Sequence, residues 1–170
     1  MRHVECLISQ VLYTGPMYIV YNDILRQFGQ TFNYFNEKRN KFPTTIFVLV
    51  SAVIKIIRVT KIPPGLKLYR GLSADRKLPD GFWKADKNGC RGYMEWGFMS
   101  TTSNYETAIQ YSGAKEGKPG PLPMVIQAYS ASIDRGGCIK DLSQYPGEVL
   151  CECRLACTPQ FLCGPCSVHP

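Results

Sequence analysis

The sequence has few of the features that mark a membrane or secreted protein. Its longest apolar run, Ile46–Ile57, is short and contains Lys55, which predicts a buried helix rather than a membrane span. Arg2 and Glu5 place charges at the N-terminus, and neither the longer apolar region nor the cleavage site of a secretory signal is evident. We therefore expect a soluble, cytoplasmic protein.

Histidine and acidic residues are also scarce. The two histidines, His3 and His169, lie near the ends of the chain and in no motif, so we expect neither to bind a metal or act as a base. The 13 acidic residues are outnumbered by 20 lysines and arginines, and the net charge of +7 favours acidic partners or phosphate-bearing ligands. No aromatic–basic repeat typical of RNA-binding proteins is present, so we expect no nucleic-acid partner.

The 170 residues suit one folded domain, and their first third has the apolar spacing of helices. Gly15-Pro16 predicts a break between two of these helices. Residues 28–42 are polar, aromatic and basic, which predicts a short helix and a loop. Another helix is predicted to begin near Pro43. We expect its buried side to carry Ile46, Leu49, Val53, Ile56 and Ile57.

After Pro63-Pro64-Gly65 the pattern changes from helical to alternating. Leu66, Leu68 and Arg70 share one face of a predicted strand. An arginine on an apolar face needs an acceptor, which could be a structural carboxylate or a phosphate. The following residue, Gly71, would permit close backbone approach by a ligand or would mark a bulge.

A second strand is predicted where Trp96, Phe98 and Ser100 alternate onto one face. It ends in four consecutive hydroxyl residues, at positions 100–103. Such hydroxyls can bind a polar ligand and orient a carboxylate, or they can satisfy local backbone groups in a turn. Asn104 then predicts the N-cap of a helix that continues to Tyr111.

Two further strands are predicted, one over residues 123–130 and one after Glu148. Arg70, Ser100 and Glu148 each therefore belong to a strand end, in this order along the chain. The order resembles the Arg–Ser–Glu pattern of arginine-specific mono-ADP-ribosyltransferases. The segments that carry the resemblance are Leu68-Tyr69-Arg70-Gly71, Gly97-Phe98-Met99-Ser100-Thr101-Thr102, Ala108-Ile109-Gln110-Tyr111, Ser143-Gln144-Tyr145-Pro146-Gly147-Glu148, and the helical Leu12-Tyr13-Thr14-Gly15-Pro16 and Tyr21-Asn22.

The resemblance implies an α+β fold with N-terminal helices and a two-sheet β core of the ADP-ribosyltransferase type. Residues 1–150 would form this domain, with a helical lead-in over 1–62 and the β core over 66–150. The implied activity is transfer of ADP-ribose from NAD⁺ to the arginine side chain of an acceptor protein, with release of nicotinamide. NAD⁺ would be a substrate, and no metal would be needed because nicotinamide leaves from a cationic pyridinium.

The resemblance also implies a role for each of three catalytic residues. Glu148 would hydrogen-bond a ribose hydroxyl and offset the positive charge that develops on the ribose in the transition state. Ser100 would orient that carboxylate and touch the nicotinamide ribose. Arg70 would hold the phosphates of NAD⁺, which would supply the acceptor that its position on an apolar face requires.

Three further residues would complete the NAD⁺ site on the same resemblance. The backbone of Gly71 would contact the amide group of nicotinamide. Thr101 would serve both local structure and the shape of the ligand site. Tyr111 would form an aromatic wall beside nicotinamide, or would simply pack against the core as a helix residue.

The last motif departs from the Glu-x-Glu usual in this family. If Tyr145-Pro146-Gly147 sets the alignment, Glu148 is the first glutamate and Leu150 occupies the catalytic position. If the Glu148-Val149-Leu150 match sets it, Glu148 is catalytic and Pro146 replaces the arginine-directed acid. Glu152 lies slightly beyond, on the face that the strand period gives to Glu148 and Leu150, and could substitute for the missing acid. One acid is missing either way, so an NAD⁺ glycohydrolase and an inactive NAD-binding or interaction module are the alternatives.

Residues 151–170 form a cysteine-rich tail in which the resemblance ends. Five of the eight cysteines lie here, but their spacing matches no zinc motif, and a disulfide framework is not supported without a secretory signal. We expect the tail to be disordered, as the product of a shifted reading frame or a truncated gene model near Val149.

Overall fold

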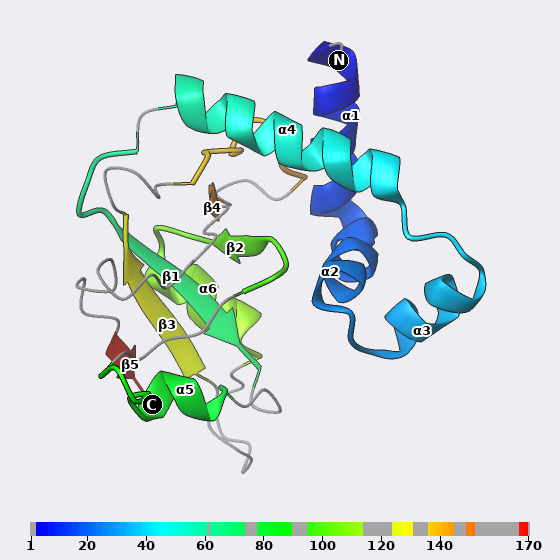
Figure 1. Cartoon of the computed structure of the whole chain (residues 1–170). Coiled ribbons are helices and arrows are strands. Elements are labelled where there is room, and N and C mark those ends of the chain that lie inside the picture. Colours follow the sequence, from blue (N-terminus) through cyan, green and yellow to red (C-terminus); the bar gives the residue numbers. More distant parts are fainter. Residues whose placement is uncertain are drawn as a thin grey trace.

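The structure is a computed structural model that describes residues 3–60, 62–73, 78–89, 95–113, 124–130, 136–144, 149–151 and 167–169. Four N-terminal helices precede a region of short strands and two further helices, so the general α+β class is confirmed (Figure 1). The helices are α1 (His3–Leu12), α2 (Tyr18–Arg26), α3 (Gln30–Glu37), α4 (Pro43–Val59), α5 (Asp80–Trp83) and α6 (Tyr105–Tyr111).

Helix α4 begins at Pro43, as predicted, because proline is pre-organised for the first turn of a helix. Leu49 and Val53 are fully buried, one turn apart on the side of the helix that packs into the core. The core also contains Tyr13, Tyr21, Phe98 and Ile139, with Ile46, Ile56 and Ile57 packed against it. The predicted buried side of this helix is thus confirmed. None of the helices in the described ranges combines the length and apolarity needed to cross a bilayer.

The predicted break at Gly15-Pro16 is present between α1 and α2. Tyr13–Met17 form a π-helical turn, and Gly15 has a non-helical backbone with φ −82° and ψ −162°. This kink turns the chain so that Tyr13 and Tyr21, on either side of it, both enter the core. The helical lead-in therefore presents side chains from two helices to the β region.

Two small antiparallel sheets make up the β region. One has the order β1-β3-β5, formed by Lys67–Leu72, Met124–Tyr129 and Ser167–His169. The other pairs β2 (Met99–Thr101) with β4 (Val149–Cys151), so that Ser100 lies opposite Leu150. A β-bridge between Tyr69 and Thr102 connects the two sheets, with N–O distances of 2.7 and 2.9 Å. The bridge brings the strand that carries Arg70 next to the strand that carries Ser100.

The strand predicted around Trp96 is shorter than expected. Strand β2 begins only at Met99, and Trp96 is 67% exposed while Phe98 is 2% exposed, so the two do not share a buried face. The reason is local hydrogen bonding. The backbone N–H groups of Gly97 and Phe98 donate to the side chains of Glu95 and Asn22 instead of to a neighbouring strand.

The cysteine-rich tail is described in part. Cys151 ends β4 and Ser167–His169 form β5, while residues 152–166 and Pro170 lie outside the described ranges. The expectation of a disordered tail stays a prediction for the segment as a whole.

Candidate functional site

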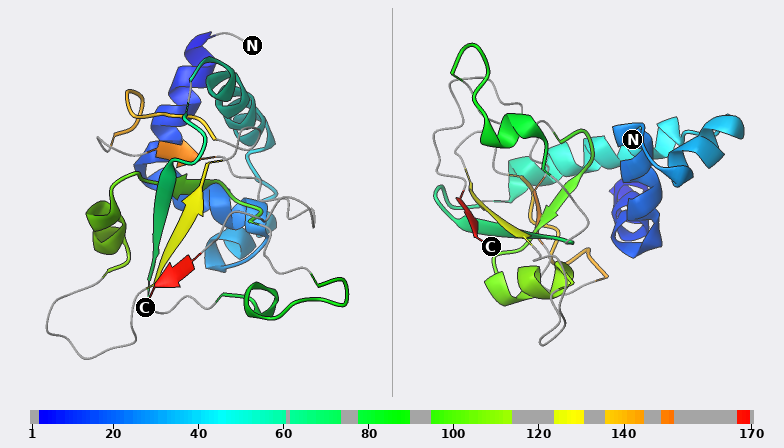
Figure 2. Two further views of the ribbon diagram at one scale, coloured as in Figure 1. Left: turned by 90° about the vertical axis from the view of Figure 1, so that its left-hand side faces the viewer. Right: turned by 90° about the horizontal axis from the view of Figure 1, so that it is seen from below.

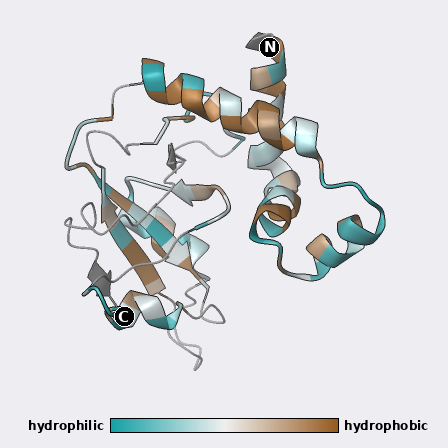
Figure 3. Cartoon of the chain, viewed as in Figure 1, coloured by the Kyte–Doolittle hydropathy of each residue, from teal (hydrophilic) through white to brown (hydrophobic). Residues whose placement is uncertain are grey.

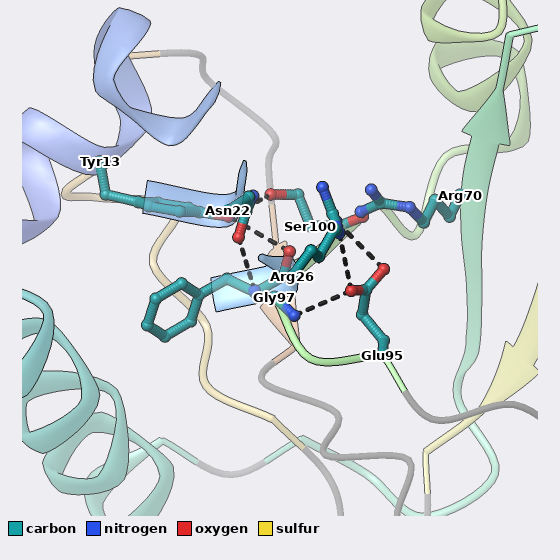
Figure 4. Close-up of polar contacts among 8 residues, drawn as sticks. Tyr13, Asn22, Arg26, Arg70, Glu95, Gly97 and Ser100 are labelled. Carbon is teal, nitrogen blue, oxygen red and sulfur yellow. Dashed lines mark hydrogen bonds and ion pairs between the residues drawn. The ribbon is translucent and has the colours of Figure 1, made fainter. Parts of the chain in front are cut away.

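Arg70 and Ser100, thirty positions apart in the sequence, meet in the structure. The guanidinium Nη1 of Arg70 donates a hydrogen bond of 2.9 Å to the main-chain oxygen of Ser100 (Figure 4). Both residues are half-buried. The sequence left a carboxylate or a phosphate as the acceptor for Arg70, and the acceptor observed here is a backbone carbonyl, which satisfies part of the donor capacity of the guanidinium.

The position of Arg70 follows from the alternation of β1. Leu68 is buried, and Arg70, two positions later, continues the same face of the strand at the point where it passes β2. The bridge between Tyr69 and Thr102 holds the two strands together beside this point. The positively charged side chain of Arg70 is thereby held next to the main chain of the hydroxyl-rich segment.

Tyr13, from the helical lead-in, also contacts Ser100. The hydroxyl of Tyr13 lies 3.4 Å from Ser100 Oγ and donates to the main-chain oxygen of Phe98 at 3.4 Å. Since Tyr13 has one hydroxyl proton, that donation makes Ser100 the donor toward Tyr13. Asn22 Nδ2 donates to the Tyr13 hydroxyl at 3.3 Å, so a chain of polar contacts connects α2 with Ser100 (Figure 4).

The segment before β2 is attached to α2 by two side chains one helical turn apart. Asn22 Oδ1 accepts from the backbone N–H of Phe98 at 2.7 Å. Arg26 forms a two-pronged ion pair with Glu95, with Nε–Oε1 and Nη2–Oε2 distances of 2.9 and 3.1 Å. Glu95 Oε1 also accepts from the N–H of Gly97 at 2.8 Å. These bonds place the start of β2, and with it Ser100, against the helices.

Gly97 is required by the closeness of this attachment. A Cβ atom at this position would lie 2.7 Å from Asn22 Oδ1 and 3.1 Å from Arg26 Nη2. Both atoms belong to side chains, so a larger residue at position 97 would displace the Asn22 and Arg26 side chains and weaken their bonds to Phe98 and Glu95. The glycine therefore permits the close approach of these two side chains.

Thr102, in the same hydroxyl segment, serves local structure. Its Oγ1 accepts from the N–H of Asn104 at 3.1 Å, and Asn104 caps α6 by accepting from the N–H groups of Glu106 and Thr107. For Thr102 the turn interpretation is thus confirmed. Thr101 and Thr102 are each 4% exposed, and the predicted role of Thr101 in the shape of a ligand site stays a prediction.

Gly71, in β1, packs against α6, the helix that ends at Tyr111. A Cβ atom at Gly71 would overlap the carbonyl oxygen of Ala108 and lie 2.6 Å from the backbone nitrogen of Ser112. Glycine is therefore needed here for the close packing of α6. Tyr111 is the last residue of α6 and is 55% exposed. Their predicted contacts with nicotinamide stay predictions.

Glu148, the third predicted catalytic residue, lies outside the described residues, as do Pro146 and Glu152. The described neighbour is β4, which begins at Val149, one position after Glu148, and pairs Val149 with Thr101 and Leu150 with Ser100. The chain segment that carries Glu148 thus leads directly into the strand that borders Ser100.

Four residues that hold the site together carry no functional motif of their own in the sequence: Tyr13, Asn22, Arg26 and Glu95. Tyr13 and Asn22 belong to the lead-in segments that resemble the family, which was the available indication of their importance. Asn22 and Arg26 also have the four-residue spacing of side chains on one face of a helix. The sequence matches no protein-family model and no curated protein.

Proposed function

We propose that this chain transfers ADP-ribose from NAD⁺ to the side chain of a protein arginine and releases nicotinamide. The observation that carries the proposal is the contact between Arg70 and Ser100, two residues of the Arg–Ser–Glu order that are distant in sequence. The third, Glu148, precedes the strand paired with Ser100. The proposal includes an ADP-ribosyltransferase-type core over residues 66–150, to which the two sheets connected at Tyr69 and Thr102 would belong.

The proposed reaction breaks the bond between the ribose C1′ and the nicotinamide nitrogen, and the bonding electrons leave with nicotinamide. A guanidinium nitrogen of the acceptor arginine then bonds to C1′ and loses a proton. Arg70 suits the pyrophosphate because its planar fork of N–H groups matches phosphate oxygens. Glu148 would stabilise the positive charge on the ribose, which is larger in the transition state than in the substrate.

A second candidate, NAD⁺ binding without turnover, is favoured by the register of β4. Leu150 is the residue opposite Ser100, and it is the position that the Tyr145-Pro146-Gly147 alignment assigns to the catalytic glutamate. A leucine there supplies no carboxylate, so under this alignment turnover would be lost. Under the other alignment Pro146 replaces the arginine-directed acid, and water would then replace arginine as the acceptor.

The test is nicotinamide release from NAD⁺ by the purified chain, with and without an arginine analogue, beside a calorimetric titration with NAD⁺. Release that increases with the analogue supports transfer, and release that ignores it supports hydrolysis. Binding without release supports the inactive module, and the absence of binding contradicts all three.

Two variants test the roles of single residues. Glu148→Gln should lower turnover about 100-fold or more. Arg70→Ala should weaken NAD⁺ binding, and Lys67→Ala, an exposed cation on the same strand, is the matched control.

The variant Leu150→Glu, which restores Glu-x-Glu, distinguishes the two alignments. If Glu148 is the arginine-directed acid, the restored carboxylate opposite Ser100 should raise arginine-dependent turnover. If Glu148 is already catalytic, Leu150→Glu should leave turnover unchanged or lower it, and Pro146→Glu should be the variant that promotes transfer.

A further inference from the structure

Helix α3 and the loop that follows it form a surface with little contact to the rest of the molecule. No residue of α3 is buried. Figures 1 and 2 show α3 at the outer end of the helical part, away from β1 and β3, and Figure 3 shows that its surface is largely hydrophilic. We call residues 30–43 the α3 surface.

A row of aromatic rings attaches the α3 surface to the core. Tyr34 packs edge-on against Phe35, Phe35 against Phe42, and Phe42 against Tyr21, with centroid distances of 5.1, 5.1 and 5.8 Å. Tyr21 is 2% exposed, whereas Tyr34, at the outer end of the row, is 56% exposed. The α3 surface is therefore packed against the core through these rings, and Tyr34 at its outer end is exposed to solvent.

Cations dominate this surface. Residues 30–43 contain Lys38, Arg39 and Lys41 but one acid, Glu37, and all four are exposed. An open depression of about 550 Å³ is lined by Asn36, Arg39, Lys41 and Pro43. Within the described part of the chain, these three cations have no carboxylate partner.

Left-handed backbone at non-glycine residues of the described chain occurs at helix ends. The three such residues are Gln27 at φ 54° after α2, Arg39 at 52° after α3 and Phe42 at 46° before α4. At Arg39 the conformation is an ordinary helix cap, in which the N–H of Asn40 donates to the main-chain oxygen of Phe35 at 3.0 Å. This cap fixes the backbone of a residue that lines the depression.

We propose that the α3 surface binds an acidic segment of another polypeptide, with carboxylates received by Arg39 and Lys41 in the depression. Charge complementarity points to this partner, because the exposed residues Arg39 and Lys41 line one open depression together with Asn36. The exposed ring of Tyr34 adds an apolar contact of the kind enriched at protein interfaces.

A single-stranded nucleic acid fits the α3 surface less well. Base stacking is strongest on rings with both faces open, and here Lys38 lies over one face of Tyr34 at 5.9 Å and Lys41 over one face of Phe32 at 5.5 Å. The two cations that line the depression, Arg39 and Lys41, also form a compact site rather than the extended groove that follows a phosphate backbone.

The experiment is a fluorescence-anisotropy titration of the whole chain with a labelled oligoglutamate peptide, at low salt and at about 150 mM salt. The variant Arg39→Asn/Lys41→Gln removes both cations and keeps a residue that tolerates positive φ at position 39. We expect its affinity to fall about tenfold or more. Lys87→Gln/Lys140→Gln, which removes two exposed cations elsewhere, is the control with the same net charge and should change affinity less than about twofold.

Several results would overturn the proposal. Equal weakening by both double variants would mean that the net charge alone attracts the peptide. Failure of the wild-type chain to bind oligoglutamate, or equal binding of oligolysine, would exclude an acidic partner. Tighter binding of oligo(dT) that depends on Arg39 and Lys41 would assign the α3 surface to nucleic acid. Matching urea-unfolding curves of the variants establish that each protein is folded.

Discussion

Gln10 on α1 has a side-chain nitrogen that is buried and makes no hydrogen bond in the described part of the chain. The residue is 1% exposed, and an unsatisfied buried amide is unfavourable by about 1–3 kcal/mol. We predict that Gln10→Met, which keeps the length of the side chain and removes the amide, raises the free energy of unfolding by about 1 kcal/mol. Urea unfolding measures this change. The exposed Gln30, replaced in the same way, is the control, and a loss of stability in Gln10→Met would mean that the amide has a partner in solution.

The buried hydroxyl of Tyr21 should make the free energy of unfolding depend on pH in alkaline solution. Burial raises the pKa of the Tyr21 hydroxyl above its ordinary value of 10.0. The unfolded chain therefore loses this proton at a lower pH than the folded chain, so the free energy of unfolding is unaffected below about pH 10 and falls above it.

We predict that Tyr21→Phe makes unfolding less pH-dependent above pH 10, because the group that links stability to pH is removed. Urea unfolding between about pH 9 and pH 11 tests this. Tyr18→Phe, at a tyrosine that is 47% exposed, is the matched control. An unchanged slope in Tyr21→Phe would show that Tyr21 ionises equally in both states.

At the scale of single elements, local chemistry made several boundaries predictable. Pro43 begins α4 and Asn104 caps α6, as expected from the preference of each residue for a helix start. The start of β2 was predicted too early because its preceding backbone groups bond to Glu95 and Asn22. Those partners lie partly on another element, and their positions cannot be inferred from alternation within the strand.

The spacing on α1 predicted a helix but not its buried side. Ser9 and Gln10 are 3% and 1% exposed, whereas the apolar residues of the helix remain open in the described structure. The apolar residues with exposures between 43% and 60% are Val4, Leu7, Ile8, Val11 and Leu12. Tertiary contacts, which include the bond from Gln144 to Val11, therefore orient α1 against its apolar periodicity.

The packing of α6 on β1 predicts a large effect of Gly71→Ala. The new Cβ would overlap the backbone of Ala108, which cannot move without displacing the helix. We predict a loss of about 2–3 kcal/mol in the free energy of unfolding, measured with urea. Gly15→Ala is the control, because its Cβ would meet only the flexible end of the Gln144 side chain, at 3.0 Å. Equal effects of the two substitutions would contradict the packing argument.

At the scale of the whole molecule, the sequence could not predict how the helices pack against the β region. The α+β class and the order Arg70, Ser100, Glu148 were visible in it, since they depend on local spacing and on motifs. The pairing of Arg26 with Glu95 joins residues 69 positions apart and has no local pattern. The same applies to the bond between Tyr13 and Phe98, 85 positions apart. Such contacts decide where Ser100 lies, although Ser100 itself could be proposed from its motif.

The pairing of Arg26 with Glu95 should therefore stabilise the joint between the helices and β2. The side chains are 24% and 10% exposed and their bonds are two-pronged, so removing one partner takes two charge-assisted hydrogen bonds from a partly buried group. In a double-mutant cycle with Arg26→Met and Glu95→Gln, we predict a coupling of about 1–2 kcal/mol in the free energy of unfolding.

The cycle Lys84→Met with Asp80→Asn is an internal control for this prediction. That pair is 4.0 Å apart with side chains 81% and 91% exposed, and it should show no measurable coupling. Coupling as weak at Arg26–Glu95 as at the control would mean that the backbone bonds to Asn22 and Glu95 alone position β2.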